Sequence, residues 1–426
     1  MKRFLLSLFL ALAASPIYLH ADEPVKTGWS VGLLPAVNYN NDLGFQIGGL
    51  GQVYHYGDGS LYPQYLHKFE AHAYLYSKGA KQFIANYDSK HLIPGKRLTL
   101  SAQYMDNPLC GFFGFNGAAS PYYSTLDLKK SADKDDGIAF YAHHQQRFLF
   151  SADVQGSLAP GLTWIGGVQY TWQRYADVSL SPYNGTETLY HQYVETGLIP
   201  EEDNFGHRVE LKGGLVYDTR DLEANPGRGI YATAQVTGGG SWSSACRTSL
   251  LFSADIRQYI PVVPSLLMLA YQVAYKGLVA GSLPFYALPA FNMRGSYSTR
   301  IVGNGVAWGS ADIRFTAARG TLLKQFFEVG LVAFADAGGV VQPYELEAQR
   351  LLGDHTTVKT LDGETFGPYR CIFDPAVATG ERLHISVGGG FFFTMNRNFV
   401  TAIELGKPLN PQDGNFGLYI NLGFSF

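Results

Sequence analysis

The chain has 426 residues and a formal charge of −3, from 32 Lys and Arg against 35 Asp and Glu, so nothing in its charge suggests a nucleic-acid partner. Charged residues make up only 16%, below the usual fraction of about a quarter, although the hydrophobic 46% is ordinary. The 28 Tyr, 28 Phe and 49 Gly fit either a membrane barrel with an apolar outer face and aromatic rims or a glycine-rich soluble β-protein.

The chain begins with a short charged segment and an apolar run. Met1-Lys2-Arg3 precede the run Phe4–Ala14, and Ala21 supplies a small residue at a cleavage point. This pattern predicts a signal peptide over residues 1–21. The apolar run is too short for a membrane helix, which needs roughly 20 apolar residues. We therefore expect an exported chain that, if it spans a membrane, does so as a barrel.

A strand-like run begins at Trp29, so we expect residues 22–28 to form a short periplasmic segment and residues 29–426 one barrel domain. Apolar and polar residues then alternate with period two between clusters of turn formers. Sixteen such segments begin near Trp29, Leu43, His67, Lys81, Arg97, Gly137, Leu162, Gly206, Gly229, Arg247, Leu266, Gly305, Lys324, Arg382, Asn398 and Asn415.

The charges within these segments keep to one parity. Between Arg208 and Asp218, for example, Glu210 and Lys212 alternate with Leu211 and other apolar residues. A charge on the lipid face of a barrel costs about 2–4 kcal/mol near the middle of the membrane, so the charged face should line the lumen. The sequence therefore predicts an all-β, sixteen-stranded antiparallel transmembrane β-barrel of the outer membrane.

The connections alternate between short and long. His91–Lys96 and Ala159–Gly161 are short, whereas Asp106–Asp136 and Lys276–Asn304 are long. Outer-membrane barrels have short periplasmic turns and long outer loops. This alternation places the N-terminus in the periplasm and supports a count of sixteen strands.

One short-side connection carries a dense set of turn formers and charges between two amphipathic strands. We expect its charges to pair across a tight periplasmic hairpin, which makes its residues structural. The residues concerned are Asp218, Arg220, Asp221, Asn225, Pro226, Arg228 and Gly229.

The long connection Lys276–Asn304 ends in the stretch Phe291–Asn304, in which Gly295 follows Arg294. A loop of this length is usually functional or disordered. About forty residues later, Asp336 lies between small residues on a predicted strand. The arginine needs an anion, and this segment offers a single carboxylate on a neighbouring strand.

At these motifs the sequence resembles the BamA/TamA superfamily of outer-membrane barrels, also called bacterial surface antigens, most clearly over residues 208–426. In that family a (Val/Ile)-Arg-Gly-(Phe/Tyr) loop folds into the barrel, and its arginine pairs with the aspartate of a Phe-x-Asp-x-Gly strand. The resemblance implies a lumen loop lock made of Arg294, Gly295, Phe334, Asp336 and Gly338. The chain departs from the family pattern at Met293 and at Ser296, which displaces the aromatic residue to Tyr297.

The chain ends on an alternating run, in which Leu418, Ile420, Leu422, Phe424 and Phe426 share one face. We expect this last strand to pair with the first and to turn its phenylalanines toward lipid. The resemblance further implies that Leu422, Phe424 and Phe426 form the signal read by the machinery that inserts barrels.

The sequence shows no catalytic or metal-binding pattern. It contains no G-x-S-x-G motif, and the adjacent His143 and His144 on a predicted strand should point to opposite faces. We therefore expect no enzyme and no cofactor. The cysteines Cys110, Cys246 and Cys371 are odd in number, so at most one pair can form, and the spacing does not decide which.

The resemblance implies a factor that inserts or translocates proteins through a weak seam between the first and last strands of the barrel. Pro35 in the first strand cannot donate a ladder hydrogen bond, which suits an edge strand. The expected partners are outer-membrane lipid, client β-barrel or secreted proteins and a periplasmic partner, since the usual periplasmic repeats have no room here. The alternatives are a passive channel or a surface-exposed, adhesin-like barrel, and, less favoured, a membrane hydrolase.

Overall fold

The computed structural model describes residues 25–40, 43–62, 64–120, 122–130, 137–184, 187–223, 225–242, 246–322, 325–344, 380–396 and 399–426, and four short strands between residues 354 and 370. The predicted signal peptide, residues 1–21, lies outside the described residues and stays a prediction. No helix among the described residues has the length and apolar character needed to cross a membrane.

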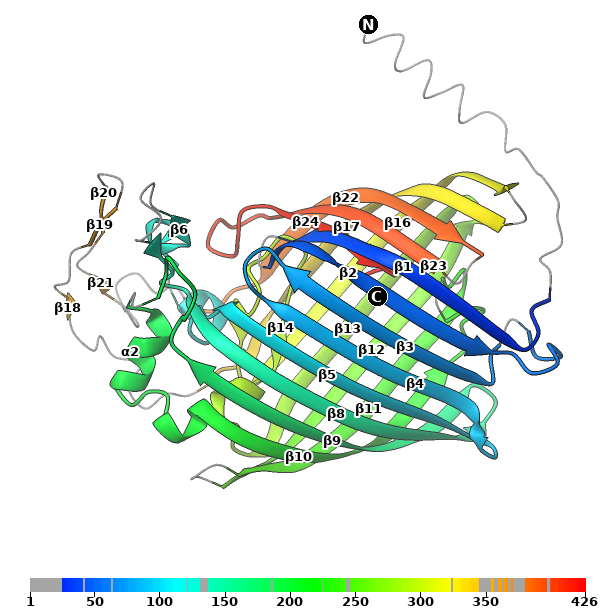
Figure 1. Cartoon of the computed structure of the whole chain (residues 1–426), viewed down its shortest axis with the longest axis horizontal. Helices are drawn as coiled ribbons and strands as arrows, with labels where there is room; N and C mark the ends of the chain where they lie inside the picture. The colour runs from blue at the N-terminus through cyan, green and yellow to red at the C-terminus, as the bar shows by residue number, and fades with distance from the viewer. Residues whose placement is uncertain are drawn as a thin grey trace, which may run out of the picture.

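One antiparallel sheet of sixteen strands forms the body of the molecule, and each strand is hydrogen-bonded to the next in chain order (Figure 1). The strands are β1 (Trp29–Asn40), β2 (Gly44–His55), β3 (His67–Tyr76), β4 (Lys81–Ile93), β5 (Lys96–Gly111), β8 (Ala142–Ala159), β9 (Leu162–Ala176), β10 (Phe205–Asp218), β11 (Gly229–Trp242), β12 (Arg247–Val263), β13 (Leu267–Gly281), β16 (Gly305–Leu322), β17 (Gln325–Gln342), β22 (His384–Met395), β23 (Phe399–Pro408) and β24 (Gly417–Leu422). The predicted sixteen-stranded all-β fold is confirmed.

The remaining elements are small and lie in the connections. They are the strand pairs β6 (Lys129–Lys130) with β7 (Gly137–Ile138), β14 (Ala290–Phe291) with β15 (Ile301–Val302), β18 (Asp354–His355) with β21 (Tyr369–Arg370) and β19 (Lys359–Leu361) with β20 (Glu364–Phe366), the 3-10 turns η1 (Gly117–Ala119), η2 (Ser124–Leu126), η3 (Glu201–Asn204) and η4 (Phe285–Ala287), and the helix α2 (Leu189–Glu195). The segment expected from Gly137 onward is divided, because β7 precedes the long strand β8.

Strand alternation separates an apolar outer face from a polar lumen. In β10, Leu211 is 66% exposed, whereas Arg208 and Glu210 on the other parity are buried. At the end of β10 near the long loops, Phe205 packs on Trp172 on the outer face. Such an arrangement matches the apolar band and aromatic rims of a barrel in lipid.

The two ends of the sheet lie side by side without a β-ladder between them. The curvature of the sheet brings β1 next to β24 (Figure 1), but in the part of the chain that the structure describes, the ladder runs from β1 around to β24 and does not close. The expectation that the first and last strands pair is therefore wrong in this form. Gly423, with φ +100°, turns the chain away from the strand direction, so that β24 ends at Leu422.

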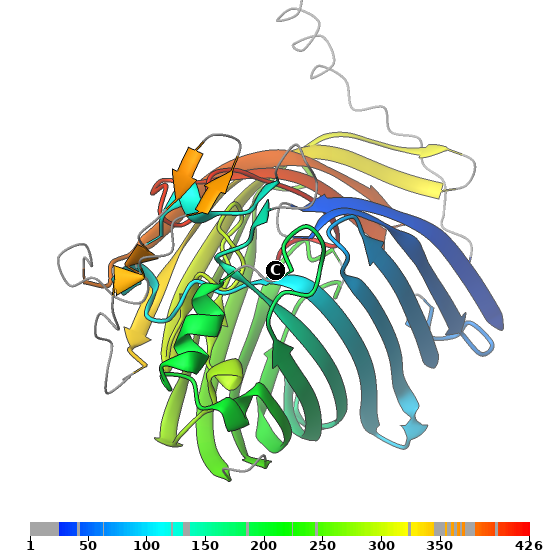
Figure 2. The ribbon, with the colours of Figure 1, turned by 60° about the vertical axis from the view of Figure 1, so that its left-hand side comes forward.

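The long loops pack together into a cap at one end of the barrel, the end brought forward in Figure 2. Phe112, Tyr193 and Phe285, from three different connections, share one buried aromatic cluster. Arg300 fastens this cap from within, because its guanidinium donates to the carbonyl oxygens of residues 117, 120 and 412 at 2.8–2.9 Å. The short turns lie at the opposite end.

Candidate functional site

The connection between β13 and β16 folds into the lumen and packs against the barrel wall. Phe291 of β14, within this connection, stacks on Trp308 of β16, with ring centroids 5.4 Å apart. Gly338 of β17 makes this possible, because a Cβ there would lie 2.6 Å from the Phe291 ring. Gly338, a member of the predicted lock, therefore contributes by leaving room for the Phe291 ring and not by a charge.

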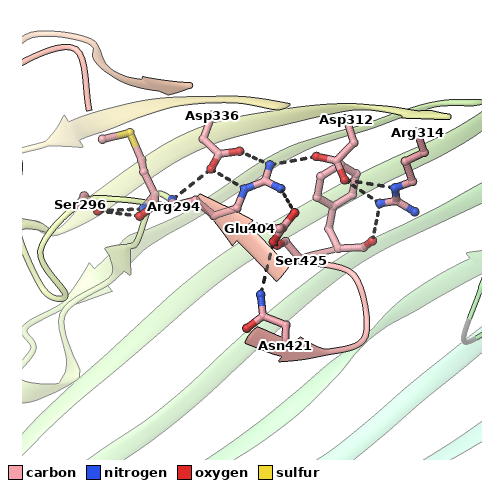
Figure 3. A network of polar contacts seen from close by, with 10 residues as sticks. Arg294, Ser296, Asp312, Arg314, Asp336, Glu404, Asn421 and Ser425 are labelled. Carbon is pink, nitrogen blue, oxygen red and sulfur yellow. Dashed lines mark hydrogen bonds and ion pairs between the residues drawn. The ribbon is translucent and has the colours of Figure 1, made fainter. Parts of the chain in front are cut away.

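Arg294 and Asp336 form a bidentate ion pair in the lumen, as Figure 3 shows. Nη2 and Nε of Arg294 lie 2.6 Å and 2.9 Å from the two carboxylate oxygens, and the backbone N–H of Arg294 also donates to Asp336 at 3.1 Å. The guanidinium lies over the ring of Phe334, 3.5 Å from its centroid. The structure thus brings together the residues that the two motifs singled out.

Two further carboxylates and a second arginine complete the network. Nη2 of Arg294 lies 2.9 Å from Asp312, and Nη1 lies 2.8 Å from Glu404. Arg314 pairs with the other oxygen of Asp312 at 2.8 Å. All five side chains are at least nine-tenths buried, which is tolerable because each charge has an opposite partner and hydrogen bonds.

The loop tip lies directly on the backbone of β23. Gly295 has φ +95°, and a Cβ there would lie 2.6 Å from the backbone of Gly406. The N–H of Gly295 donates to the hydroxyl of Tyr419 in β24 at 2.8 Å. The tip therefore contacts the last two strands, next to the place where the sheet stays open.

The departures from the family pattern have clear positions. Ser296 closes the tip turn, because its hydroxyl accepts from the N–H of Met293 at 3.1 Å and donates to the Met293 carbonyl at 2.9 Å. The displaced Tyr297 stacks on Phe113, with centroids 5.2 Å apart, and its hydroxyl lies 2.7 Å from that of Tyr122. The displaced aromatic residue thus joins the loop to the cap.

The C-terminal tail enters the lumen, so the expectation that Phe424 and Phe426 face lipid is wrong. Phe424 lies against the guanidinium of Arg314 at 3.7 Å, and Ser425 donates to Glu404 at 3.0 Å. Phe426 is 8% exposed and packs with Tyr259 and neighbouring side chains. Leu422 is the last residue of β24. The turn at Gly423 thus ties the tail to the same network as the loop.

The predicted hairpin charges pair within the turn between β10 and β11. Arg220 makes a bidentate pair with Asp218, at 2.8 Å and 2.9 Å. One carboxylate oxygen of Asp221 accepts from the N–H groups of Gly227 and Arg228 at 2.8 Å and 3.2 Å. The remaining predicted members complete the turn: Asn225 reaches Glu328 at 3.5 Å, Pro226 follows it, and Gly229 has φ +112°.

The same hairpin also reaches the wall formed by β4 and β5. Glu223 lies 3.1 Å from both Lys90 and Arg97. Burial alone would raise the pKa of Glu223, but the charges of Arg97 and Lys90 outweigh burial and hold this pKa below its usual range. The ionised carboxylate of Glu223 therefore joins the hairpin to β4 and β5 at the short-turn end of the barrel, a contact that we call the electrostatic strap.

No catalytic set emerges from the described residues. His143 is buried in the lumen wall among aromatic rings, whereas His144 on the opposite face lies 2.7 Å from Asp106. The described residues include no group of three His, Cys, Asp or Glu side chains placed to hold a metal. Cys246 is a free thiol, the Sγ of Cys110 lies 3.5 Å from the side-chain oxygen of Gln145, and Cys371 lies outside the described residues.

Comparison with known proteins gives one family and two informative solved structures. A model described as the Omp85 superfamily domain matches residues 83–426. The structure of BamA from Haemophilus ducreyi lacking POTRA domains 1–3 is 13% identical, with a TM-score of 0.54 over 94% of this chain and 71% of that one.

CdiB from Escherichia coli is 10% identical, with a TM-score of 0.55 over 94% of this chain and 63% of its own, so this chain spans less than two thirds of CdiB. No curated protein matches. At these identities the two likenesses show a shared barrel fold.

Proposed function

Because the chain belongs to the Omp85 superfamily, we propose that this integral barrel of the Gram-negative outer membrane inserts or translocates protein clients, and that clients engage it at the seam between β1 and β24. The observation that carries the proposal is the open sheet: sixteen strands surround the lumen, and no ladder joins β1 to β24 in the described part of the chain.

An open seam supplies the chemistry that a client strand needs. An edge strand presents a row of backbone N–H and C=O groups, which pair with any extended segment brought alongside. Strand addition of this kind gains affinity from main-chain hydrogen bonds and does not depend on one sequence. The proposal assigns no catalytic step to the barrel. It assigns the delivery of clients to the barrel to a separate periplasmic protein.

The lumen network supports this role by bracing one side of the seam. Arg294 holds the loop to Glu404 of β23 at 2.8 Å, and the loop tip touches both β23 and Tyr419 of β24. The last two strands are thus fixed from inside the barrel. A wall that is firm on one side can open on the other without losing its shape.

A seam-locking disulfide tests the proposal. Cys110, Cys246 and Cys371 are first replaced by serine, and Val37→Cys is combined with Ile420→Cys, for which a disulfide needs Cα atoms about 4.4–6.8 Å apart. The measurement is the rate at which an unfolded eight-stranded outer-membrane barrel inserts into proteoliposomes that contain the protein. We expect the oxidised form to lose its acceleration of insertion and the reduced form to regain it.

The control disulfide joins Phe391→Cys to Ile403→Cys, which are already paired across the β22–β23 ladder. It should leave insertion unchanged. Equal rates for the seam lock in its oxidised and reduced forms would reject a seam-based function.

A passive channel is the second candidate, favoured by a lumen cavity of about 1190 Å³ beside the loop. Traffic through the lumen would ignore a seam lock. Single-channel conductance, recorded with and without residues 291–304, measures this property directly: a large increase on removing the loop identifies a plugged pore, and high conductance with the loop present identifies an open one.

A further inference from the structure

The last strand is held very differently on its two sides. Toward β23 it has a ladder of six residue pairs, and from the lumen Asn421 donates to Glu404 at 3.3 Å. Tyr419 accepts from the loop tip at 2.8 Å. Toward β1 it has no ladder. A force that opens the seam therefore separates β1 from β24 and leaves β24 attached to β23 and the loop.

A side chain crosses the seam in place of a ladder. Oδ1 of Asn38 in β1 accepts hydrogen bonds from the backbone N–H of Ile420 at 3.2 Å and from the N–H of Tyr39 in its own strand at 2.5 Å. Asn38 has the lumen parity of its strand, since its neighbours Val37 and Tyr39 are exposed on the outer face. The amide oxygen thus occupies a backbone donor that a paired strand would otherwise bind.

A hydrogen bond to a side-chain acceptor breaks by a different motion from a hydrogen bond to a backbone acceptor. A ladder carbonyl can leave only if its strand shifts, whereas an amide leaves by rotation about side-chain bonds, a local motion that needs no displacement of the strand. A single hydrogen bond of this type is also modest in net free energy. It can therefore cap an edge without sealing it.

We propose that Asn38 is the latch of the seam: its amide oxygen caps the Ile420 N–H at rest and yields it to the backbone carbonyl of an incoming strand. This inference rests on the proposed function, because a latch matters only if clients use the seam. It further assigns β1 as the side that moves, because the loop tip and Glu404 hold β24 from the lumen. When the seam opens, β1 stays joined to β2 by its ladder of twelve residue pairs.

The experiment measures seam opening without any client. In a background with the three cysteines replaced by serine, spin labels are placed on Leu33 of β1 and Leu405 of β23, both exposed on the outer face. Distances are recorded by double electron–electron resonance in nanodiscs. We expect Asn38→Ala to raise the population of long distances about fivefold, as the loss of roughly 1 kcal/mol predicts.

Three controls separate the latch from general destabilisation. Asn38→Asp keeps an acceptor oxygen and should resemble the parent. Gln46→Ala removes a lumen amide from β2, at the position paired with Asn38, and should leave the distances unchanged. A label pair on Val387 and Leu405, on the neighbouring strands β22 and β23, should not respond to any variant.

A cross-seam distribution in Asn38→Ala identical to the parent, or equal changes in Gln46→Ala, would overturn the latch. Failure of the proposed function gives another pattern: Asn38→Ala opens the seam, yet client insertion stays insensitive to the seam-locking disulfide. The distance measurement and the insertion assay therefore fail independently.

Discussion

Arg294 holds its loop because one guanidinium satisfies three carboxylates from three strands. Nη2 donates to both Asp312 and Asp336, Nε donates to Asp336 and Nη1 donates to Glu404, at 2.6–2.9 Å. An ammonium group is a point charge and cannot span this arrangement. The position thus requires both the charge and the shape of arginine.

Replacing Arg294 by alanine should therefore release the loop and destabilise the barrel. Removing one partner leaves buried carboxylates without a counter-charge, which costs about 3–5 kcal/mol in a dry site. We expect a lower unfolding temperature, read from heat-modifiable migration, and faster hydrogen exchange over residues 291–304. Arg294→Lys should fall between the parent and Arg294→Ala.

Arg319→Ala is the matched control for that experiment, because its pair with Glu328 spans 3.9 Å at the short-turn end of the barrel. It should change the unfolding temperature little. Equal effects of the two alanine substitutions would show that the network does not hold the loop.

The sequence predicted the Arg294–Asp336 pair because both residues lie in recognisable motifs. It did not predict that Asp312 and Glu404 join them. Strand parity places a residue on the lumen face, but the depth at which two distant strands bring their side chains together depends on sheet register and curvature, which a single sequence does not display. Glu404 is 110 residues from Arg294.

At the scale of elements, the sixteen strands were predictable because each must show lipid one face and water the other. The end of β24 was not, since the alternating pattern continues through Phe424 and Phe426 although the chain turns inward. Gly423 at φ +100° makes the turn, and a glycine within an alternating run is equally compatible with a strand. Alternation of apolar and polar residues separates a polar from an apolar environment, but the apolar environment need not be lipid. Phe424 and Phe426 find theirs inside the lumen.

The hairpin between β10 and β11 gives a prediction at this scale. Glu223→Gln removes the carboxylate that reaches Lys90 and Arg97, so the hairpin amides, residues 219–228, should exchange hydrogen faster at pH 7. The global unfolding temperature should change little, because exposed ion pairs contribute at most about 1 kcal/mol. Glu195→Gln, at the exposed end of helix α2 in the cap, is the control.

The same pair of proteins should show a defined pH dependence. The folded-state pKa of Glu223 lies below its usual value, so its stabilising contribution is present above the unfolded pKa and is lost as the pH falls through the folded value. The difference between parent and Glu223→Gln, corrected for intrinsic exchange, should therefore shrink as the pH falls below the usual range of a glutamate side chain. A difference that stays unchanged over the whole acid range in which the barrel remains folded would contradict an electrostatic strap.

At the scale of the whole molecule, the C-terminal residues stabilise the folded barrel, in addition to any role as an assembly signal. Deleting Phe426 removes a ring that packs with Tyr259 inside the lumen, where burying such a side chain contributes about 1.5–3 kcal/mol. We still expect the larger loss in assembly, measured as the yield of folded, heat-modifiable barrel in native membranes. Phe426→Tyr, which keeps the aromatic terminus, should assemble normally; an unchanged yield after the deletion would remove the assembly role.

The cap and the loop lock of this barrel also constrain the order in which the barrel can fold. Arg300 binds carbonyl oxygens 183 and 112 residues away, and Gln412 bonds to Tyr122 across 290 residues. Contacts so distant along the chain are made late, because closing long loops is entropically unfavourable until the intervening structure exists. The loop lock needs β23, and the cap needs the connection that follows it. Both therefore report completion: a nascent barrel that lacks β23 and the connection after it lacks the contacts of Glu404 and Gln412, and only the finished chain holds its loop and its cap in place.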